Sequence, residues 1–382
     1  MRMFQWLSMT SVAICLLFGI SSRAEAQGTK LLIETPYGAD DEARTRRDPR
    51  WDLYGFARAR LVGLEDFSLD TQGTRLGRDG WLESRLLVGG SYSFTPRFEV
   101  TVELDALNGQ AAGGFTNIGM VRGEDTFQIR RDRPSGGGVI TPRKAFLRYD
   151  LPIGRLLVGQ QAFGWGLGLL ANDGSTEMDF GDAYQGSLVE RAAIFVTPFV
   201  RKNQVPEWLR GLGFFAALDV PFRDDNASLL AGDFAWSALM GAQLRSRRVE
   251  AGVFEAFRSQ TDREDPNHPA RRPLVRVSIT DAYVRAFLTD RFASQTLRLE
   301  AEAAVIAGQS TRPYFEQTAA DGASVQSFGG VARLRFDDRP RRLTAKLEVG
   351  YASGDNDARD RVYRQFTFNT DYNVGLILFD QV

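Results

Sequence analysis

Cysteine and histidine are nearly absent from this chain of 382 residues, which contains one of each. The cysteine, Cys15, lies in an apolar run near the N-terminus, so the remainder of the chain has no thiol. Zinc and other soft metals are bound by clusters of cysteine and histidine, and no such cluster can form here. We therefore expect no cofactor, no thiol chemistry and no soft-metal site.

The histidine, His268, stands between Pro266 and Pro269 in a segment typical of a solvated loop. A Ser-His-Asp hydrolase needs its histidine beside a serine, and the sequence offers no such arrangement. We therefore do not expect an enzyme. Calcium stays open as an alternative because it asks only for oxygen ligands, which 172–179 and 354–360 contain, although polar loop tips commonly have this composition.

Long apolar runs are missing beyond the first 26 residues. Segment 1–26 itself predicts a cleavable signal peptide, with a basic start at Arg2, an apolar run over 11–20 and a small-x-small site ending at Ala26. Because Ile14 rather than a small residue precedes Cys15, we expect no lipoprotein anchor. No later stretch reaches the roughly eighteen apolar residues of a transmembrane helix.

Neither sign of charge dominates, since 47 Lys and Arg stand against 48 Asp and Glu. Nothing in this balance indicates a nucleic-acid partner. A chain of this length would usually divide into about two or three soluble domains, yet no linker, low-complexity tract or composition shift separates any. The alternative is one large sheet closed on itself.

The chain does contain strict alternation of apolar and polar residues. In 98–107 every second residue is apolar, and the residues between are Glu99, Thr101, Glu103 and Asp105. Because successive side chains of a strand point to opposite faces, such a segment has one apolar and one charged face. Segments 297–303 and 343–351 repeat the pattern, and weaker copies lie at 53–63, 82–94, 143–151, 155–163, 188–199, 211–220, 233–246, 248–257, 275–288, 326–336 and 370–380.

The length of these strands and the chemistry of their faces predict the fold class. They run for about nine to twelve residues, the tilted span of a bilayer, whereas strands of soluble sandwiches typically have about five or six. We therefore expect an all-β protein: a single closed antiparallel transmembrane β-barrel of about sixteen strands, within about fourteen to eighteen, in the outer membrane of a Gram-negative bacterium. The barrel is expected over 53–382, after an N-terminal periplasmic or luminal segment at 27–52. A periplasmic β-rich protein is the alternative.

Short turns and long loops should alternate around such a barrel. The segments 95–97, 151–154 and 337–341 predict the short turns. Longer segments rich in Gly, Asp, Arg and Pro predict outward loops at 108–141, 171–187, 258–273, 308–325 and 353–368. Loop 108–141 is open to two interpretations, a constriction folded into the pore or a mobile surface loop.

The charged face is where function is expected. One interpretation is that its charges pair across neighbouring strands and stiffen the wall. The other is that unpaired arginines, best represented by Arg58/Arg60 and Arg333/Arg335, select an anionic or sugar-like solute. The candidate pore-lining residues are Arg58, Arg60, Arg85, Arg148, Arg298, Arg333, Arg335, Lys346, Glu99, Glu103, Glu300 and Glu302.

Parts of the chain resemble a known family. Segment 347–357, LEVGYASGDND, with Phe366 and Phe368 after it, resembles a signature near the end of alginate-export-type outer-membrane porins, and 156–166 is similar to another of their strands. The match departs at Gln160, where that family usually has a lumen-facing arginine. Segment 371–379 resembles the terminal strand of outer-membrane barrels. The resemblance covers about a fifth of the chain and implies passage of an anionic polysaccharide or oligosaccharide, alongside a periplasmic export complex.

Three functions stay in competition. The leading one is an outer-membrane channel, with export of an acidic polysaccharide as its sharpest version. The second is a general or solute-specific diffusion porin. The third is a non-conducting structural or docking barrel whose lumen is filled by paired charges. All three have outer-membrane lipid as a partner, and the sequence leaves the oligomeric state open.

Overall fold

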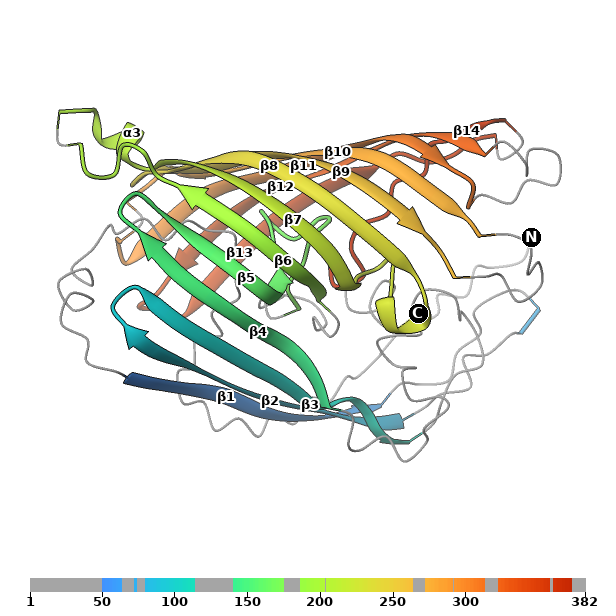
Figure 1. Cartoon of the computed structure of the whole chain (residues 1–382), viewed down its shortest axis with the longest axis horizontal. Helices are drawn as coiled ribbons and strands as arrows, with labels where there is room; N and C mark the ends of the chain where they lie inside the picture. Colours follow the sequence, from blue (N-terminus) through green and yellow to red (C-terminus); the bar gives the residue numbers. More distant parts are fainter. Residues whose placement is uncertain are drawn as a thin grey trace, which may run out of the picture.

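Long antiparallel strands make up nearly all of the structure, a computed structural model that describes residues 50–63, 72–73, 80–113, 140–174, 186–202, 204–263, 272–290, 292–312, 322–357 and 360–372. Each strand from β1 to β13 pairs with the next one in the chain (Figure 1). Their bounds are β1 (Arg50–Gly63), β2 (Gly80–Thr95), β3 (Phe98–Gly113), β4 (Ile140–Leu151), β5 (Gly154–Phe163), β6 (Ser187–Val196), β7 (Leu212–Arg223), β8 (Phe234–Arg245), β9 (Val249–Thr261), β10 (Leu274–Phe287), β11 (Gln295–Ser310), β12 (Ala323–Asp338) and β13 (Leu343–Ala352).

The remaining regular elements are short. Strand β14 (Val362–Tyr363) joins β12 in parallel, α3 (Glu207–Arg210) is a single helical turn, and η1 (Leu229–Ala231) is a 3₁₀ turn. No helix in the described part of the chain is long and apolar enough to cross a membrane.

The predicted all-β antiparallel architecture is confirmed, and the first thirteen predicted segments all fall on strands. The strands extend further than predicted at one end. β3 continues to Gly113 and β11 to Ser310, so the predicted loops at 108–141 and 308–325 are shorter than expected. Glycines and uncharged polar residues interrupt the alternation there, but backbone pairing needs no alternation and continues.

The two faces of the sheet have inverted polarity. Large apolar side chains such as Leu218, Met240 and Val305 are 62%, 67% and 53% exposed on the outer face. The fully buried side chains of the inner face include Arg143 and Glu300. A soluble protein places these groups the other way round.

A few charged residues do not follow this rule, and Glu255 is one of them. Glu255 alternates with the inward residues of β9 and therefore lies on the outer face, where the hydroxyl groups of Ser278 and Thr280 on β10 donate hydrogen bonds to its carboxylate. These bonds compensate part of the cost of a carboxylate on an apolar face.

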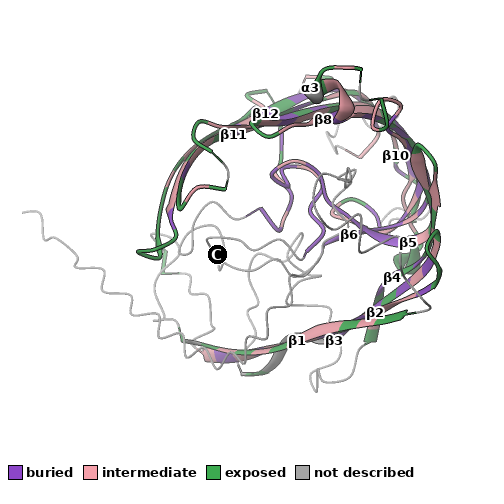
Figure 2. Ribbon diagram, turned by 90° about the vertical axis from the view of Figure 1, so that its left-hand side faces the viewer, coloured by how far each residue is buried: buried purple, intermediate pink, exposed green. Residues whose placement is uncertain are grey.

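The sheet curls into an incomplete ring with buried non-strand segments inside it (Figure 2). Among the described residues β1 and β13 pair only with β2 and with β12, so the predicted closure is not present there. The strand predicted at 370–380 is wrong at its start, because residues 370–372 are not in a strand, and the rest of it lies outside the described residues. The predicted count of about sixteen strands stays a prediction.

The two ends of the ring differ. At one end, called here the turn end, the chain reverses at 96–97, 152–153, 246–248 and 339–342, and α3 also lies there (Figure 1). The predicted turns at 95–97 and 151–154 are confirmed, whereas the turn predicted at 337–341 begins later, because Asp337 and Asp338 still pair in β12. The opposite end, the loop end, carries the longer connections.

Both prolines inside strands stand at irregularities of the pairing. Pro142 of β4 follows a register shift opposite Glu103 and Leu104, and Pro221 of β7 follows one opposite Leu188 and Val189. Proline lacks the N–H that a regular ladder requires, so it is tolerated where the ladder is interrupted. At this shift the register of β3 and β4 passes from Lys144 to Pro142 and skips Arg143.

Gly159 of β5 generates the first prediction. Its φ is +123°, and a Cβ atom there would collide with the carbonyl oxygen of Ala145 on β4. We expect Gly159→Ala to lower the free energy of unfolding by about 1–3 kcal/mol. Gly63→Ala is the matched control, since a Cβ at Gly63 meets nothing within 4 Å. Thermal unfolding in detergent measures both, and equal losses would contradict the steric explanation.

Candidate functional site

The inner wall formed by β1 to β4 is a network of ion pairs. Lys144 lies 2.8 Å and Arg143 3.2 Å from oxygens of Glu103. Arg85 lies 2.9 Å from Asp105. All five side chains are nearly inaccessible, so each buried charge is compensated by a neighbour of opposite sign.

A second network lies on β10 to β13. Arg285 lies 2.5 Å from Glu300, and Arg333 lies 2.6 Å from Glu348. Glu300 is also 3.8 Å from Arg333, so one buried carboxylate is shared by basic residues of two strands. These pairs connect neighbouring strands across the inner face of the sheet.

The candidate residues predicted from the sequence all belong to the inner face, as the alternation of their strands places them. In the first wall Arg60 lies 2.5 Å from Glu83, and Arg148 lies 2.9 Å from Glu99. The interpretation in which these charges pair across strands is therefore favoured for most of them. The two proposed arginine clusters occupy different strands, β1 and β12. That these residues line a pore stays a prediction.

Between the two networks the inner wall carries an apolar patch. Phe195, Phe215, Phe254 and Tyr283 belong to a buried cluster on β6, β7, β9 and β10. The sequence predicted a polar, charge-lined interior over the whole wall, and this part of it is wrong. The adjacent pair Phe214 and Phe215 shows why: both are apolar, so their alternation does not reveal which one points inward.

Residues 164–173, the first inner segment, leave β5 and lie against this apolar wall. The ring of Trp165 has centroid distances of 5.7 Å to Phe215, 5.0 Å to Phe254 and 5.1 Å to Tyr283. Further along, Leu167 and Leu169 pack in a second buried cluster with Ala304 of β11 and Val331 of β12. The first inner segment therefore connects opposite parts of the ring.

Polar contacts hold the first inner segment at both ends. The carboxylate of Glu302 on β11 accepts hydrogen bonds from the backbone N–H groups of Leu167 and Leu169, the second at 3.1 Å. At the other end, Arg143 donates to the carbonyl oxygen of Asp173, and Arg85 donates to that of Gly174 at 2.9 Å. Side chains from β2, β4 and β11 thus fix one segment inside the ring.

Residues 366–372, the second inner segment, pack on the first. Phe366 and Tyr372 belong to the same cluster as Leu167 and Leu169. The backbone N–H of Asn369 donates to the carbonyl oxygen of Leu169 at 2.8 Å. The predicted outward loops 171–187 and 353–368 are therefore wrong for residues 171–174 and 366–368, because these apolar and amide groups find buried partners inside the ring.

The second inner segment is attached to the β7–β8 loop by Asp225. Its carboxylate accepts hydrogen bonds from the backbone N–H of Thr370 at 2.9 Å and from the Thr370 hydroxyl at 2.8 Å. Burial raises the pKa of Asp225 from 3.8 to about 6, while the hydrogen bonds from Thr370 oppose that rise and the charges of Asp371 and Asp224 add to it.

Sequence reasoning missed several residues of the site. Arg143 was not predicted as an inner residue, because strict alternation assigns it to the outer face. The register shift beside it turns its side chain inward. The buried pair Arg191 and Asp219, 2.5 Å apart on β6 and β7, alternates regularly and could have been found from the sequence. Gln160, at the position of the family's arginine, donates to the carbonyl oxygen of Pro142.

The structure tests the predictions about metal and catalytic sites only where the residues concerned are described. The described residues contain no group of three His, Cys, Asp or Glu side chains that could hold a metal ion. Asn172 and Asp173 of the calcium alternative are buried at the end of the first inner segment. His268 and loop residues 114–139 lie outside the described residues, so the predictions about them stay predictions.

No protein-family model matches the chain, and no curated protein sequence matches it. Three similar solved structures are OmpT, an outer membrane protein of Vibrio cholerae in trimer form, the outer membrane channel DcaP of Acinetobacter baumannii, and a variant of the Rh. blastica porin. Their identities are 12%, 13% and 10% and their TM-scores 0.35, 0.35 and 0.29. They cover 86%, 84% and 79% of this chain and 96%, 94% and 100% of their own. Likeness at this level carries no argument about function.

Asp225 generates the second prediction. Because its pKa is about 6 in the folded chain and 3.8 ordinarily, the folded state binds a proton more tightly, and its stability rises as the pH falls through this window. The gain is complete below 3.8 and lost as the pH rises through about 6. We expect Asp225→Asn to remove this rise, as measured by melting temperature between about pH 4 and about pH 7.5.

Asp290→Asn serves as the control for this titration, since Asp290 is 60% exposed in the β10–β11 turn. That variant should keep the pH dependence of the unsubstituted chain. If Asp225→Asn also kept it, Asp225 would not be the group that titrates.

Proposed function

We propose that this chain forms an outer-membrane β-barrel channel that passes small hydrophilic solutes past the two inner segments. The single observation that carries the proposal is the inverted polarity of the sheet, with leucine and valine outside and ion pairs inside. In a membrane barrel, lipid surrounds the apolar outer face and water contacts the polar inner face, so this arrangement is stable there.

Closure of the ring belongs to the proposal. An unpaired strand edge in lipid costs several kcal/mol per backbone group, so β1 and β13 need partners. These two strands run in the same direction, because each neighbour along the sheet reverses it. One further strand that runs antiparallel to β1 and β13 would pair with both of them. Of the ten residues after Tyr372, 373–380 belong to the predicted terminal strand, and a strand of about 9–11 residues spans a bilayer.

The inner segments favour small solutes over a polymer. They occupy the inside of the ring and are held by buried contacts to β2, β4, β10 and β11. A polysaccharide chain would have to displace the inner segments, whereas a small solute needs only the space beside these segments. The turn end then faces the periplasm, since short turns do so in barrels of this kind.

The membrane assignment predicts different effects for two exposed leucines. Leu218→Arg places a charge on the outer face of β7 and should destabilise the inserted barrel by about 2–4 kcal/mol. Leu230→Arg is the matched control, because Leu230 is 81% exposed in the β7–β8 loop and remains in water. Folding into lipid vesicles, followed by the heat-modifiable shift on gels, measures both. A water-soluble protein would tolerate the two changes equally.

Channel activity predicts an effect of Trp165. Replacing it by alanine removes the indole from its aromatic contacts and weakens attachment of the first inner segment by about 3–5 kcal/mol. We expect Trp165→Ala to raise single-channel conductance in planar bilayers. Trp236→Ala is the control, since Trp236 packs on Phe257 at the outer face. Equal conductance of all three proteins would show that the inner segments do not limit the pore.

The same recordings separate the remaining alternatives. Export of an acidic polysaccharide, with a periplasmic export complex as partner, requires that an added polyuronate block the conductance. A diffusion channel for small solutes conducts without polymer block. A non-conducting docking barrel shows no conductance in any variant.

A further inference from the structure

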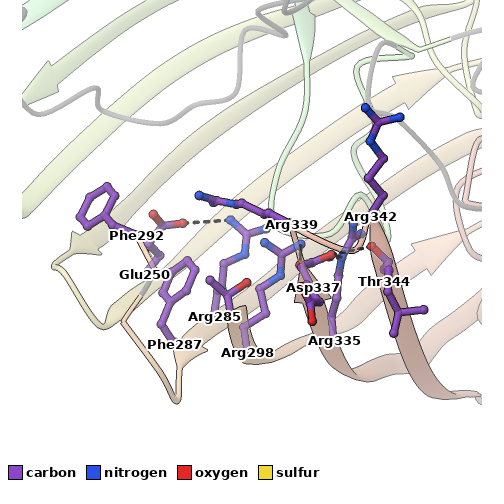
Figure 3. A pocket seen from close by; sticks show the side chains of 13 residues that line it. Glu250, Arg285, Phe287, Phe292, Arg298, Arg335, Asp337, Arg339, Arg342 and Thr344 are labelled. Atoms are coloured by element: carbon purple, nitrogen blue, oxygen red, sulfur yellow. Dashed lines mark hydrogen bonds and ion pairs between the residues drawn. The ribbon is translucent and has the colours of Figure 1, made fainter. Parts of the chain in front are cut away.

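The turn end of the ring contains a cavity of about 540 Å³ between β9 and β13. Five arginines and three carboxylates line it, together with Phe287, Phe292 and other residues of the two adjacent turns. Its volume lies within the range of small-molecule sites, about 300–1,000 Å³. Figure 3 shows Arg285, Arg298 and Arg335 side by side on neighbouring strands, with Arg339 extending from the turn toward them.

The register of the strands places like charges opposite one another in this region. Arg298 of β11 pairs with Arg335 of β12, and Arg335 pairs with Lys346 of β13. Directly opposed like charges destabilise a sheet. In the next row of inward residues toward the loop end, the sign of the charge alternates from strand to strand, because Arg333 of β12 pairs with Glu300 of β11 and Glu348 of β13. Each member of the basic row contacts an acid two residues along its own strand, Arg298 to Glu300 at 3.5 Å, Arg335 to Asp337 at 3.0 Å and Lys346 to Glu348 at 3.3 Å. Its charges are therefore compensated along the strands, whereas those of the next row are also compensated across them.

The carboxylates of the cavity are already engaged. Asp338 accepts from Arg341 and Gln295, and Glu250 lies 2.9 Å from Arg285. Asp337 contacts Arg335 at 3.0 Å but lies 4.0 Å from Arg298. The Nε of Arg298 is buried and makes no hydrogen bond to a described residue. The lining thus holds more positive charge than its own acids compensate.

Two turn arginines add to this excess. The side chains of Arg339 and Arg342 make no ion pair with any other described residue. Arg342 also has a φ of +52°, a backbone conformation in which glycine or asparagine is less strained. An arginine at such a position is unexpected for turn geometry alone, and its charge lines the cavity.

We propose that this cavity is a binding site for a small multivalent anion bearing carboxylate or phosphate groups, held by Arg298, Arg335 and Arg339 and assisted by the charge of Arg342. The inference rests on the channel function proposed above for its role in transport, where it would concentrate anions at the turn end. The planar fork of arginine matches the oxygen pairs of both groups. The rings of Phe287 and Phe292 offer an apolar wall to the carbon frame of an organic anion.

Binding is tested on the full chain in detergent, by calorimetric titration with inorganic phosphate and with malonate. We expect Arg339→Gln/Arg342→Gln to weaken binding of both anions by about tenfold or more. Arg247→Gln is the matched control, because Arg247 lies in the β8–β9 turn at the same end of the ring, is 67% exposed and does not line the cavity. Its affinities should stay within about twofold of those of the unsubstituted chain.

Arg342→Gly separates binding from folding. Glycine removes the backbone strain, so the melting temperature should stay equal or rise while affinity falls. Phe292→Ala separates the two chemistries, since it should weaken malonate and leave phosphate unchanged. Equal losses for Arg247→Gln and the double variant, or no binding of either anion to the unsubstituted chain at millimolar concentrations, would overturn the proposal. Conductance is recorded independently, so a conducting barrel without anion binding would refute this site and leave the channel intact.

Discussion

Every strand of this protein has to satisfy two different surroundings at once. The backbone is satisfied by pairing with neighbouring strands, which frees the side chains to divide between an apolar outer face and a polar inner face. Once carboxylates such as Glu103 and Glu300 lie on the buried face, each needs cations close by, because an uncompensated buried charge is very costly. The ion-pair networks of the inner wall are therefore a consequence of the inverted polarity.

The interior is divided by chemistry. Charged networks line β1 to β4 and β10 to β13, and an apolar patch lies between them on β5 to β10. The first inner segment uses both kinds of surface: Trp165 binds the apolar patch, while Glu302 and Arg143 hold the backbone on either side. The turn-end cavity is the part of the wall where five arginines and three carboxylates line one space. The two proposals, a narrowed channel and an anion site, depend on these separate features.

Regular alternation made much of the fold readable. Glu99, Thr101 and Glu103 identify the inner face of β3, because alternate residues of a strand lie on the same face. This assignment needs no knowledge of tertiary contacts. The same reasoning placed Arg298, Glu300 and Glu302 on one face of β11. It failed at Arg143, where a bulge shifts the period, and at 370–372, where an extended-looking sequence packs against Leu169 instead of joining the sheet.

The sequence by itself determined the all-β class, most of the strand positions and, except at Arg143, the side of the sheet on which the candidate charges lie, since all three follow from local periodicity and strand geometry. Only the tertiary structure decided which charges meet, that 164–173 and 366–372 turn inward, and that Arg298, Arg335 and Lys346 stand opposite one another. These outcomes depend on strand register and on contacts between residues far apart in the chain. Neither leaves a trace in a local pattern of apolar and polar residues.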